Sequence, residues 1–194
     1  MLGSLNSWSW IGASFPWCVL NKWVKCQSKS IAQQYWFGVT VFDLHVKMNK
    51  SGNIVPVSHN IPIAVTWDDI KQDLRFLNPR PDENIHLKVT MDGVTGKSYQ
   101  KSVTAFKELI DELHNNAPKL NIISAISKWA YTESTKNEFP SLMHRSLSGE
   151  CVIARLVYGR RAWAEEHNGY YLRKTGLELN KETEALMLDF IQFS

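Results

Sequence analysis

The sequence predicts an α+β fold, with a single domain whose largely antiparallel sheet is packed by three or four helices and preceded by a tryptophan-rich amino-terminal arm. Three observations support this prediction. Hydrophobic residues make up 44% and charged residues 21% of the 194 positions, as in an ordinary globular domain. Segments of alternating polarity interleave with segments of helical period. Hairpin signals outnumber plausible crossover connections. We assign residues 1–34 to the arm and residues 35–194 to the globular domain.

The predicted arm has an unusual composition. Five of the eight tryptophans and no acidic residue occur in the first 42 positions. Three lysines in this stretch give it a charge of +3, which equals the net charge of the whole chain. Tryptophan favours membrane interfaces, and lysine is attracted to anionic headgroups. The candidate membrane-binding residues are therefore Trp8, Trp10, Trp17, Trp23, Lys22, Lys25 and Lys29.

A second interpretation of the arm stays open. Exposed apolar side chains mark either a membrane contact or a protein contact. The tryptophans can therefore pack on the chain's own core or on a second copy of the chain. An amphipathic helix over residues 17–29 is compatible with either interpretation.

The first half of the globular domain shows strand and helix signals in turn. Residues 35–50 predict a strand, with a phase slip at Phe42 and Asp43 that resembles a bulge. Residues 54–65 predict an irregular strand, because their prolines cannot donate to a ladder. Thr66 is a good N-cap for a helix that continues through Leu77, with two aspartates in its first turn.

The second half continues with similar signals. Residues 84–91 alternate cleanly, so Ile85 and Leu87 face one way while His86 and Lys88 face the other. The remaining predicted elements are helices at 103–116 and 119–131, a strand at 149–158, a hairpin turn at Asn168-Gly169 and a closing helix at 181–193.

One segment resembles a phosphate-binding loop. Gly96-Lys97-Ser98 follows a predicted strand, but the motif needs a glycine at position 91, where the chain has methionine. Gly93 comes two residues too late. We favour a β-turn, with a nucleotide-binding enzyme that uses Lys97 and Ser98 as an alternative.

The sequence gives no clear catalytic or metal-binding signature. Its six histidines are scattered, and its three cysteines form no Cys-x-x-Cys pair. It has no Gly-x-Ser-x-Gly turn, and its carboxylate pairs are adjacent in sequence, where side chains diverge. We therefore predict no catalytic residue, no metal site and no cofactor.

A basic cluster in the carboxy-terminal part offers a possible nucleic-acid contact. Arg160, Arg161, Arg173 and Lys174 would face one another across the predicted hairpin, beside three aromatic residues. Cations interleaved with aromatics bind RNA, although a solvated hairpin balanced by Glu165 and Glu166 explains them as well.

Two stretches resemble the matrix proteins of rhabdovirus-like negative-strand RNA viruses. They are FGVTVFDLHVKMN at 37–49, which follows the arm, and GECVIARLVY at 149–158, which precedes a hydrophobic closing segment. The amino terminus departs from that family because it is rich in tryptophan rather than lysine, and there is no Pro-Pro-x-Tyr motif. The resemblance implies a non-enzymatic protein that binds the inner membrane face, self-associates and contacts a nucleocapsid.

The expected function is therefore that of a membrane-associating, self-assembling structural protein similar to a viral matrix protein. Its expected partners are anionic lipid, further copies of itself and a nucleocapsid or RNA. An RNA-binding accessory protein is the alternative. We find no run of 18 apolar residues and no clean signal peptide, so the expected location is the cytoplasmic face of a host membrane and the virion.

Overall fold

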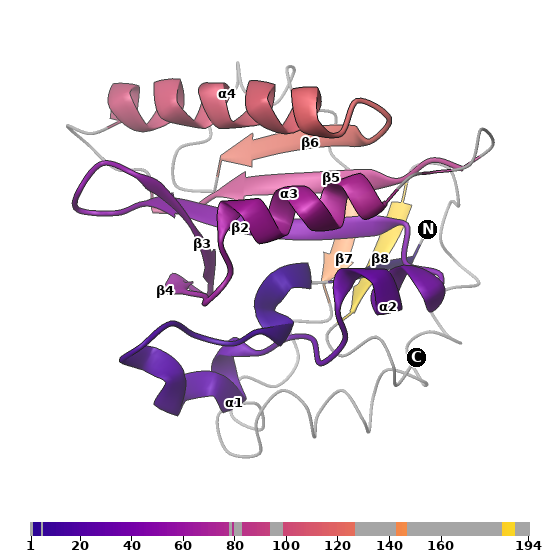
Figure 1. Ribbon diagram of the computed structural model, residues 1–194, viewed down its shortest axis with the longest axis horizontal. Coiled ribbons are helices and arrows are strands. Elements are labelled where there is room, and N and C mark those ends of the chain that lie inside the picture. The colour runs from indigo at the N-terminus through magenta and orange to yellow at the C-terminus, as the bar shows by residue number, and fades with distance from the viewer. Residues whose placement is uncertain are drawn as a thin grey trace.

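The computed structural model describes residues 2–4, 6–77, 79, 83–93, 99–126, 143–146 and 184–188 of the chain. These residues form a mixed α/β structure (Figure 1). The strands are β1 (Leu2–Ser4), β2 (Val41–Met48), β3 (Ile54–Ser58), β4 (Ile61–Pro62), β5 (His86–Met91), β6 (Asn121–Ile126), β7 (Met143–Ser146) and β8 (Glu184–Leu188). The α-helices are α1 (Asn21–Val24), α2 (Ile31–Trp36), α3 (Trp67–Phe76) and α4 (Tyr99–Asn116), with short 3-10 helices η1 (Ser7–Trp10) and η2 (Trp17–Leu20).

The sheet is mostly parallel, which corrects the prediction of a largely antiparallel sheet. Five of the seven strand pairings among the described residues are parallel, and only β2–β3 and β3–β4 are antiparallel. Strand β2 lies at the centre, because it pairs with β1, β3 and β5. The helix α4 connects β5 to β6, and parallel neighbours require such a crossover. The prediction failed because hairpin signals report only local turns, whereas parallel pairing joins segments distant in sequence.

Strand β2 is buried on both faces along most of its length. Residues 41–44 are all buried, so the strand does not alternate between core and solvent. A strand covered on both sides is typical of a parallel sheet. The phase slip that resembles a bulge is therefore explained by double-sided burial.

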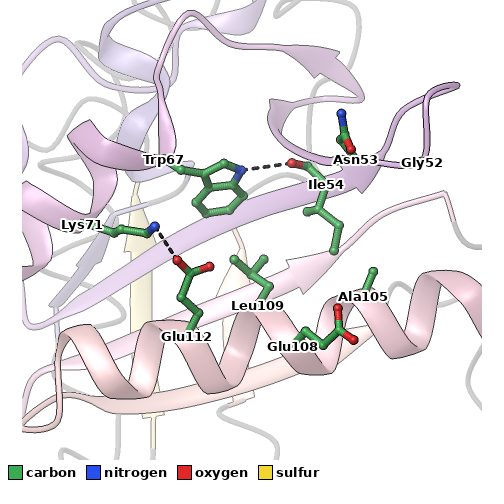
Figure 2. Close-up of a pocket in the computed structure, with 9 residues that line it drawn as sticks. All are labelled: Gly52, Asn53, Ile54, Trp67, Lys71, Ala105, Glu108, Leu109 and Glu112. Carbon is green, nitrogen blue, oxygen red and sulfur yellow. Dashed lines mark hydrogen bonds and ion pairs between the residues drawn. The ribbon is translucent and has the colours of Figure 1, made fainter.

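Helices α3 and α4 cover one face of the central strands. The predicted helix after Thr66 is confirmed as α3, and Thr66 and Asp69 form a reciprocal capping box at its start. Its buried residues Ile70 and Leu74 face the sheet. Lys71 of α3 forms an ion pair with Glu112 of α4, and this pair links the two helices at the surface (Figure 2).

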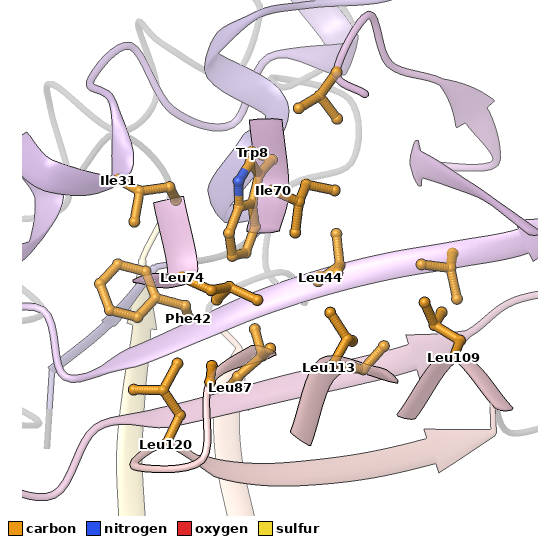
Figure 3. Packing of buried hydrophobic residues seen from close by; sticks show 14 of the residues in the cluster. Trp8, Ile31, Phe42, Leu44, Ile70, Leu74, Leu87, Leu109, Leu113 and Leu120 are labelled. Atoms are coloured by element: carbon orange, nitrogen blue, oxygen red, sulfur yellow. The ribbon is translucent and has the colours of Figure 1, made fainter. Parts of the chain in front are cut away.

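The core lies between these helices and the sheet, and it includes part of the predicted arm (Figure 3). Trp8 is fully buried among residues such as Ile70 and Leu74. Its indole N–H donates to Asp73 Oδ2 at 2.9 Å. Burial raises the pKa of the Asp73 carboxyl, the Trp8 hydrogen bond lowers it, and Asp69 raises it further, with a net increase. The first strand also belongs to the sheet, between β2 and β8.

Two predicted helices are strands in the structure. Residues 121–126 form β6 instead of part of a helix at 119–131, and residues 184–188 form β8 instead of part of a helix at 181–193. A short apolar run fits the period of a helix as well as that of a strand. These two segments are strands because β6 pairs with β5 and β8 pairs with β1. The predicted strand at 149–158 and the hairpin at 168–169 lie outside the described residues.

The burial of Trp8 predicts that the amino-terminal segment contributes strongly to stability. Trp8→Ala is expected to lower the free energy of unfolding by about 3–5 kcal/mol, because it removes a large core side chain and leaves a cavity. The matched control is Trp36→Ala, whose side chain is 78% exposed, with an expected change within about 0.5 kcal/mol. Urea unfolding followed by circular dichroism measures both. Equal effects of the two substitutions would contradict the burial of Trp8.

Candidate functional site

A polar face lies on the side of the central strands opposite the core. Along β2, Phe42, Leu44 and Val46 belong to the core, so Asp43 and His45 point the other way. Strand β5 repeats this arrangement with Lys88 and Thr90 on its polar face. The parallel register sets Asp43 beside Lys88 and His45 beside Thr90. Two neighbouring strands therefore bring four polar side chains together.

Asp43 is the centre of this cluster and is fully buried. Its Oδ2 accepts a hydrogen bond from the backbone N–H of Asn6 at 3.1 Å and lies 3.1 Å from His45 Nε2. Its Oδ1 lies 3.5 Å from Lys88 Nζ. Burial alone would raise the pKa of the Asp43 carboxyl, but the two cations and the Asn6 hydrogen bond outweigh burial and hold that pKa well below its usual range.

His45 bridges two carboxylates. Its Nε2 faces Asp43, and its Nδ1 lies 2.8 Å from Asp92 Oδ2, just beyond the end of β5. Burial lowers the pKa of the imidazole, yet Asp43 and Asp92 more than offset burial and raise the pKa to about 10. His45 is therefore an imidazolium at neutral pH, with both N–H groups directed at carboxylates.

The segment after β1 fixes the position of Asp43. The backbone N–H of Asp43 donates to Ser7 Oγ at 2.8 Å, and Ser7 Oγ lies 2.6 Å from Ser4 Oγ. The buried Gln34 side chain donates to the carbonyls of Ser7 and Lys29, which ties this segment to α2. The carboxylate is thus held by main-chain and hydroxyl groups that are themselves buried.

The turn between β3 and β4 lies next to the cluster. Its residues His59 and Asn60 both have left-handed backbones, with φ of 53° and 65°. Asn60 lies close to Gly93, the residue after Asp92, since a side-chain carbon added at Gly93 would be 3.9 Å from Asn60 Oδ1. The Lys47 ammonium donates to the Asn60 carbonyl. The turn therefore lies at the Asp92 side of the cluster. Left-handed backbone at both residues is the conformation that a two-residue hairpin turn requires.

The hydrogen bonds of Ser58 orient the His59 ring. Ser58 Oγ donates its only proton to the Val24 carbonyl at 2.7 Å, so it accepts from His59 Nδ1 at 3.0 Å. In the neutral imidazole, Nε2 then carries the lone pair. His59 is exposed, so this group combines the properties of a proton acceptor with access to solvent.

Buried polar atoms without a hydrogen-bond partner lie close to the cluster. Asn6 Oδ1 and Thr90 Oγ1 are buried and have no hydrogen-bond partner within the described part of the chain. Among those same residues, no group of three or more His, Cys, Asp or Glu side chains is suited to a metal ion. The arrangement combines two cations, the two carboxylates that pair with them and, on the neighbouring turn, an imidazole oriented by Ser58.

The structure separates the residues that the sequence suggested as membrane contacts. Trp8 lies in the core, Trp10 is partly buried and Trp17 is 49% exposed. Lys25 and Lys29 are partly buried. The side chains of Lys22 and Trp23, the loop with Lys97 and Ser98, and the cluster of Arg160, Arg161, Arg173 and Lys174 lie outside the described residues.

Sequence reasoning missed the cluster itself. The alternation of residues 84–91 correctly placed Lys88 on the face opposite Leu87, and this was the available signal. Strand β2, which carries Asp43, could be matched to β5 only through the parallel register of the two strands.

Comparison with solved structures identifies the fold. A substituted form of the phosphatidylinositol-specific phospholipase C of Staphylococcus aureus matches 98% of this chain and 84% of its own, with a TM-score of 0.63 and 15% identity. The enzyme of the same type from Listeria monocytogenes matches 99% of this chain and 89% of its own, with a TM-score of 0.52 and 13% identity. A further S. aureus structure, concerned with modulation of membrane binding by this phospholipase, matches 64% of the chain but only 46% of its own length, with a TM-score of 0.46 and 18% identity. No family model and no curated protein sequence matches the chain.

These matches correct the expected function. The chain has the fold of phospholipases C, and no matrix protein is among the structures compared above. The resemblance to viral matrix proteins, the expectation of a non-enzymatic virion protein and the alternatives of RNA or nucleotide binding are therefore set aside. In the part of the chain that the structure describes, no helix has the length and apolar character needed to cross a bilayer.

The cluster predicts an unusual titration for His45. The imidazole signals of His45 are expected to stay those of the protonated form from pH 6 to 8, because Asp43 and Asp92 hold its pKa near 10. Because the pKa of His45 is raised on folding, its protonation adds to the free energy of unfolding. This contribution is fully present below about pH 6.5 and is lost as the pH rises through about 10. NMR titration measures this, with the signal assigned through His45→Asn.

Asp43→Asn is the informative variant for the same experiment. Removing one carboxylate is expected to bring the midpoint of the His45 titration toward neutrality. A wild-type midpoint near 6.5, unchanged by Asp43→Asn, would show that the pairing does not hold in solution.

Proposed function

We propose that this chain acts on the phosphodiester of an inositol phospholipid at a membrane surface. The observation that carries the proposal is the pair of cations, Lys88 and His45, anchored by buried Asp43 on the polar face of the sheet. The likeness in fold to two phosphatidylinositol-specific phospholipases C supports it and suggests the substrate class. In parallel sheets ligands bind at the carboxyl ends of the strands, which is where Asp92 and the turn at His59 lie.

The two cations suit a phosphate. The Lys88 ammonium and the His45 imidazolium are already in place, so little reorganisation is needed when negative charge develops on a phosphodiester. Their carboxylate partners keep the empty site close to neutral. Asn6 Oδ1 and Thr90 Oγ1 provide partners for headgroup hydroxyls.

Proton transfer is assigned to His59. Phospholipase C chemistry breaks the bond between phosphorus and the glycerol oxygen, and it needs a base for the attacking oxygen and a proton for the leaving oxygen. His45 is a poor base because its pKa is about 10. His59 has a lone pair on Nε2 when Nδ1–H is bound by Ser58, so it takes the proton from a water molecule whose oxygen bonds to phosphorus. The bond between phosphorus and the glycerol oxygen breaks on the opposite side, and solvent water protonates that glycerol oxygen.

Membrane contact is assigned to the loop at residues 15–19. Phe15 is 89%, Trp17 49% and Val19 78% exposed, which is a high density of exposed apolar side chains. The Asn21 side chain holds the base of the loop, because its Oδ1 accepts from the Ala13 N–H at 2.8 Å. The same Oδ1 would be 2.6 Å from a side-chain carbon at position 12, so only glycine fits there. Lys25 and Lys29 follow in a segment without acidic residues, and they suit an anionic bilayer.

The proposed activity predicts release of a phosphorylated headgroup from phosphatidylinositol vesicles. Lys88→Met and His59→Asn are each expected to lower the rate by about 100-fold or more, since each removes one charge-stabilising or proton-transferring group. The matched control is Lys107→Met on the exposed surface of α4, with no expected change. Soluble phosphate ester released from vesicles is measured, and thermal melts check folding.

Two results would count against the activity. One is the absence of release by the wild-type chain together with no binding of inositol 1-phosphate. The other is an equal effect of Lys88→Met and Lys107→Met on the rate.

The proposed membrane contact has a separate test. Replacing Phe15 and Trp17 together by serine is expected to weaken co-flotation with anionic liposomes by about tenfold or more, because each buried ring contributes about 1.5–3 kcal/mol. The control replaces Trp36 and Phe37, which are 78% and 50% exposed, and it should leave flotation unchanged. Flotation at low and high salt separates the lysine contribution. Loss of flotation only in the control variant would place the contact elsewhere.

A further inference from the structure

A cavity lies on the opposite side of the sheet, away from the polar cluster. It is bounded by α3, α4 and the turn that follows β2, and its volume is about 330 Å³ (Figure 2). A volume near 300 Å³ is at the lower end of the range for small-molecule sites. The proposed phospholipase function uses none of its lining residues.

The floor of this cavity is apolar and held in place. The Trp67 indole N–H donates to the Ile54 carbonyl at 3.0 Å, which fixes the orientation of the ring. Leu109 of α4 is buried beneath it, and the three side chains face one space (Figure 2).

The rim carries charges of both signs: Glu108, Glu112 and Lys71 line the cavity, and the Lys101 ammonium lies beside its lining residue Gly52. Glu108 and Glu112 lie one turn apart on α4, where like charges repel. Lys71 pairs with Glu112, whereas Glu108 has no hydrogen bond or ion pair among the described residues. One carboxylate at the rim, that of Glu108, is therefore not held in an ion pair.

We propose that this cavity binds a small organic cation with an apolar body and a primary ammonium group. The apolar body would lie on Trp67 and Leu109, and the ammonium would donate to Glu108 while Lys71 stays paired with Glu112. This site is independent of the phospholipase proposal, since its residues lie on the helix-covered face of the sheet. Binding between α3 and α4 would also join two helices that the Lys71–Glu112 pair already links.

The test uses benzylamine as the cationic probe and benzyl alcohol as its neutral match. The readout is the indole N–H signal of Trp67 in a ¹⁵N–¹H spectrum, assigned by its absence from Trp67→Phe. Benzylamine is expected to shift this signal in a saturable way, with a dissociation constant of about 1 mM for so small a ligand. Benzyl alcohol should bind about two- to fivefold more weakly, the range expected for one exposed ion pair.

A pair of variants tests the role of the carboxylate. Glu108→Gln should weaken benzylamine binding by about two- to fivefold without affecting benzyl alcohol. Asp111→Asn is the matched control, because Asp111 is an exposed acid on the same helix that does not line the cavity. Any one of three results would overturn the proposal: no saturable shift with benzylamine, equal affinities for the two probes, or equal effects of the two variants.

Discussion

The buried carboxylate of Asp43 is the constraint on which the site and much of the fold depend. An ionised group inside a protein costs several kcal/mol unless charges and hydrogen bonds compensate for it. Here the compensation comes from three different places in the chain, namely Asn6, His45 and Lys88. The charge therefore requires the segment after β1 and strand β5 to be in position together. This requirement explains why an amino-terminal segment that contains several exposed aromatics is nevertheless anchored to the central strand.

The same constraint divides the chemistry between two histidines. His45 lies between two carboxylates, which raise its pKa to about 10 and so favour the protonated ring at neutral pH. A residue in this state supplies positive charge, while both of its N–H donors are occupied by Asp43 and Asp92. His59 has an uncharged hydroxyl as the partner of its Nδ1 and stands on an exposed turn. These different surroundings are the reason why the proposed function gives electrostatic stabilisation to His45 and proton transfer to His59.

Local signals predicted local structure well. The helix α3 follows from Thr66, Asp69 and the spacing of its apolar residues, and its observed start agrees with the prediction. The alternation of residues 84–91 likewise gave the two faces of β5. Residues 121–126 were wrongly predicted as helix, because six apolar and small residues carry too little periodicity to distinguish a helix from a buried strand. The cluster around Asp43 could not be predicted from spacing, since it depends on the parallel register between β2 and β5.

The exposed aromatic side chains form two groups, and their surroundings differ. Trp36 and Phe37 end α2, and the preceding Tyr35 donates to the carboxylate of Glu83 at 2.6 Å. A carboxylate at that position disfavours approach to an anionic bilayer. Both patches lie in the acid-free first 42 positions, but no hydrogen bond or ion pair joins residues 15–19 to an acidic side chain among the described residues, and lysines follow this loop. Charge therefore distinguishes two patches that hydrophobicity alone would rank as equal. This difference in charge favours the loop at residues 15–19 as the membrane contact. The end of α2, which is similarly apolar, is therefore the control surface for that assignment.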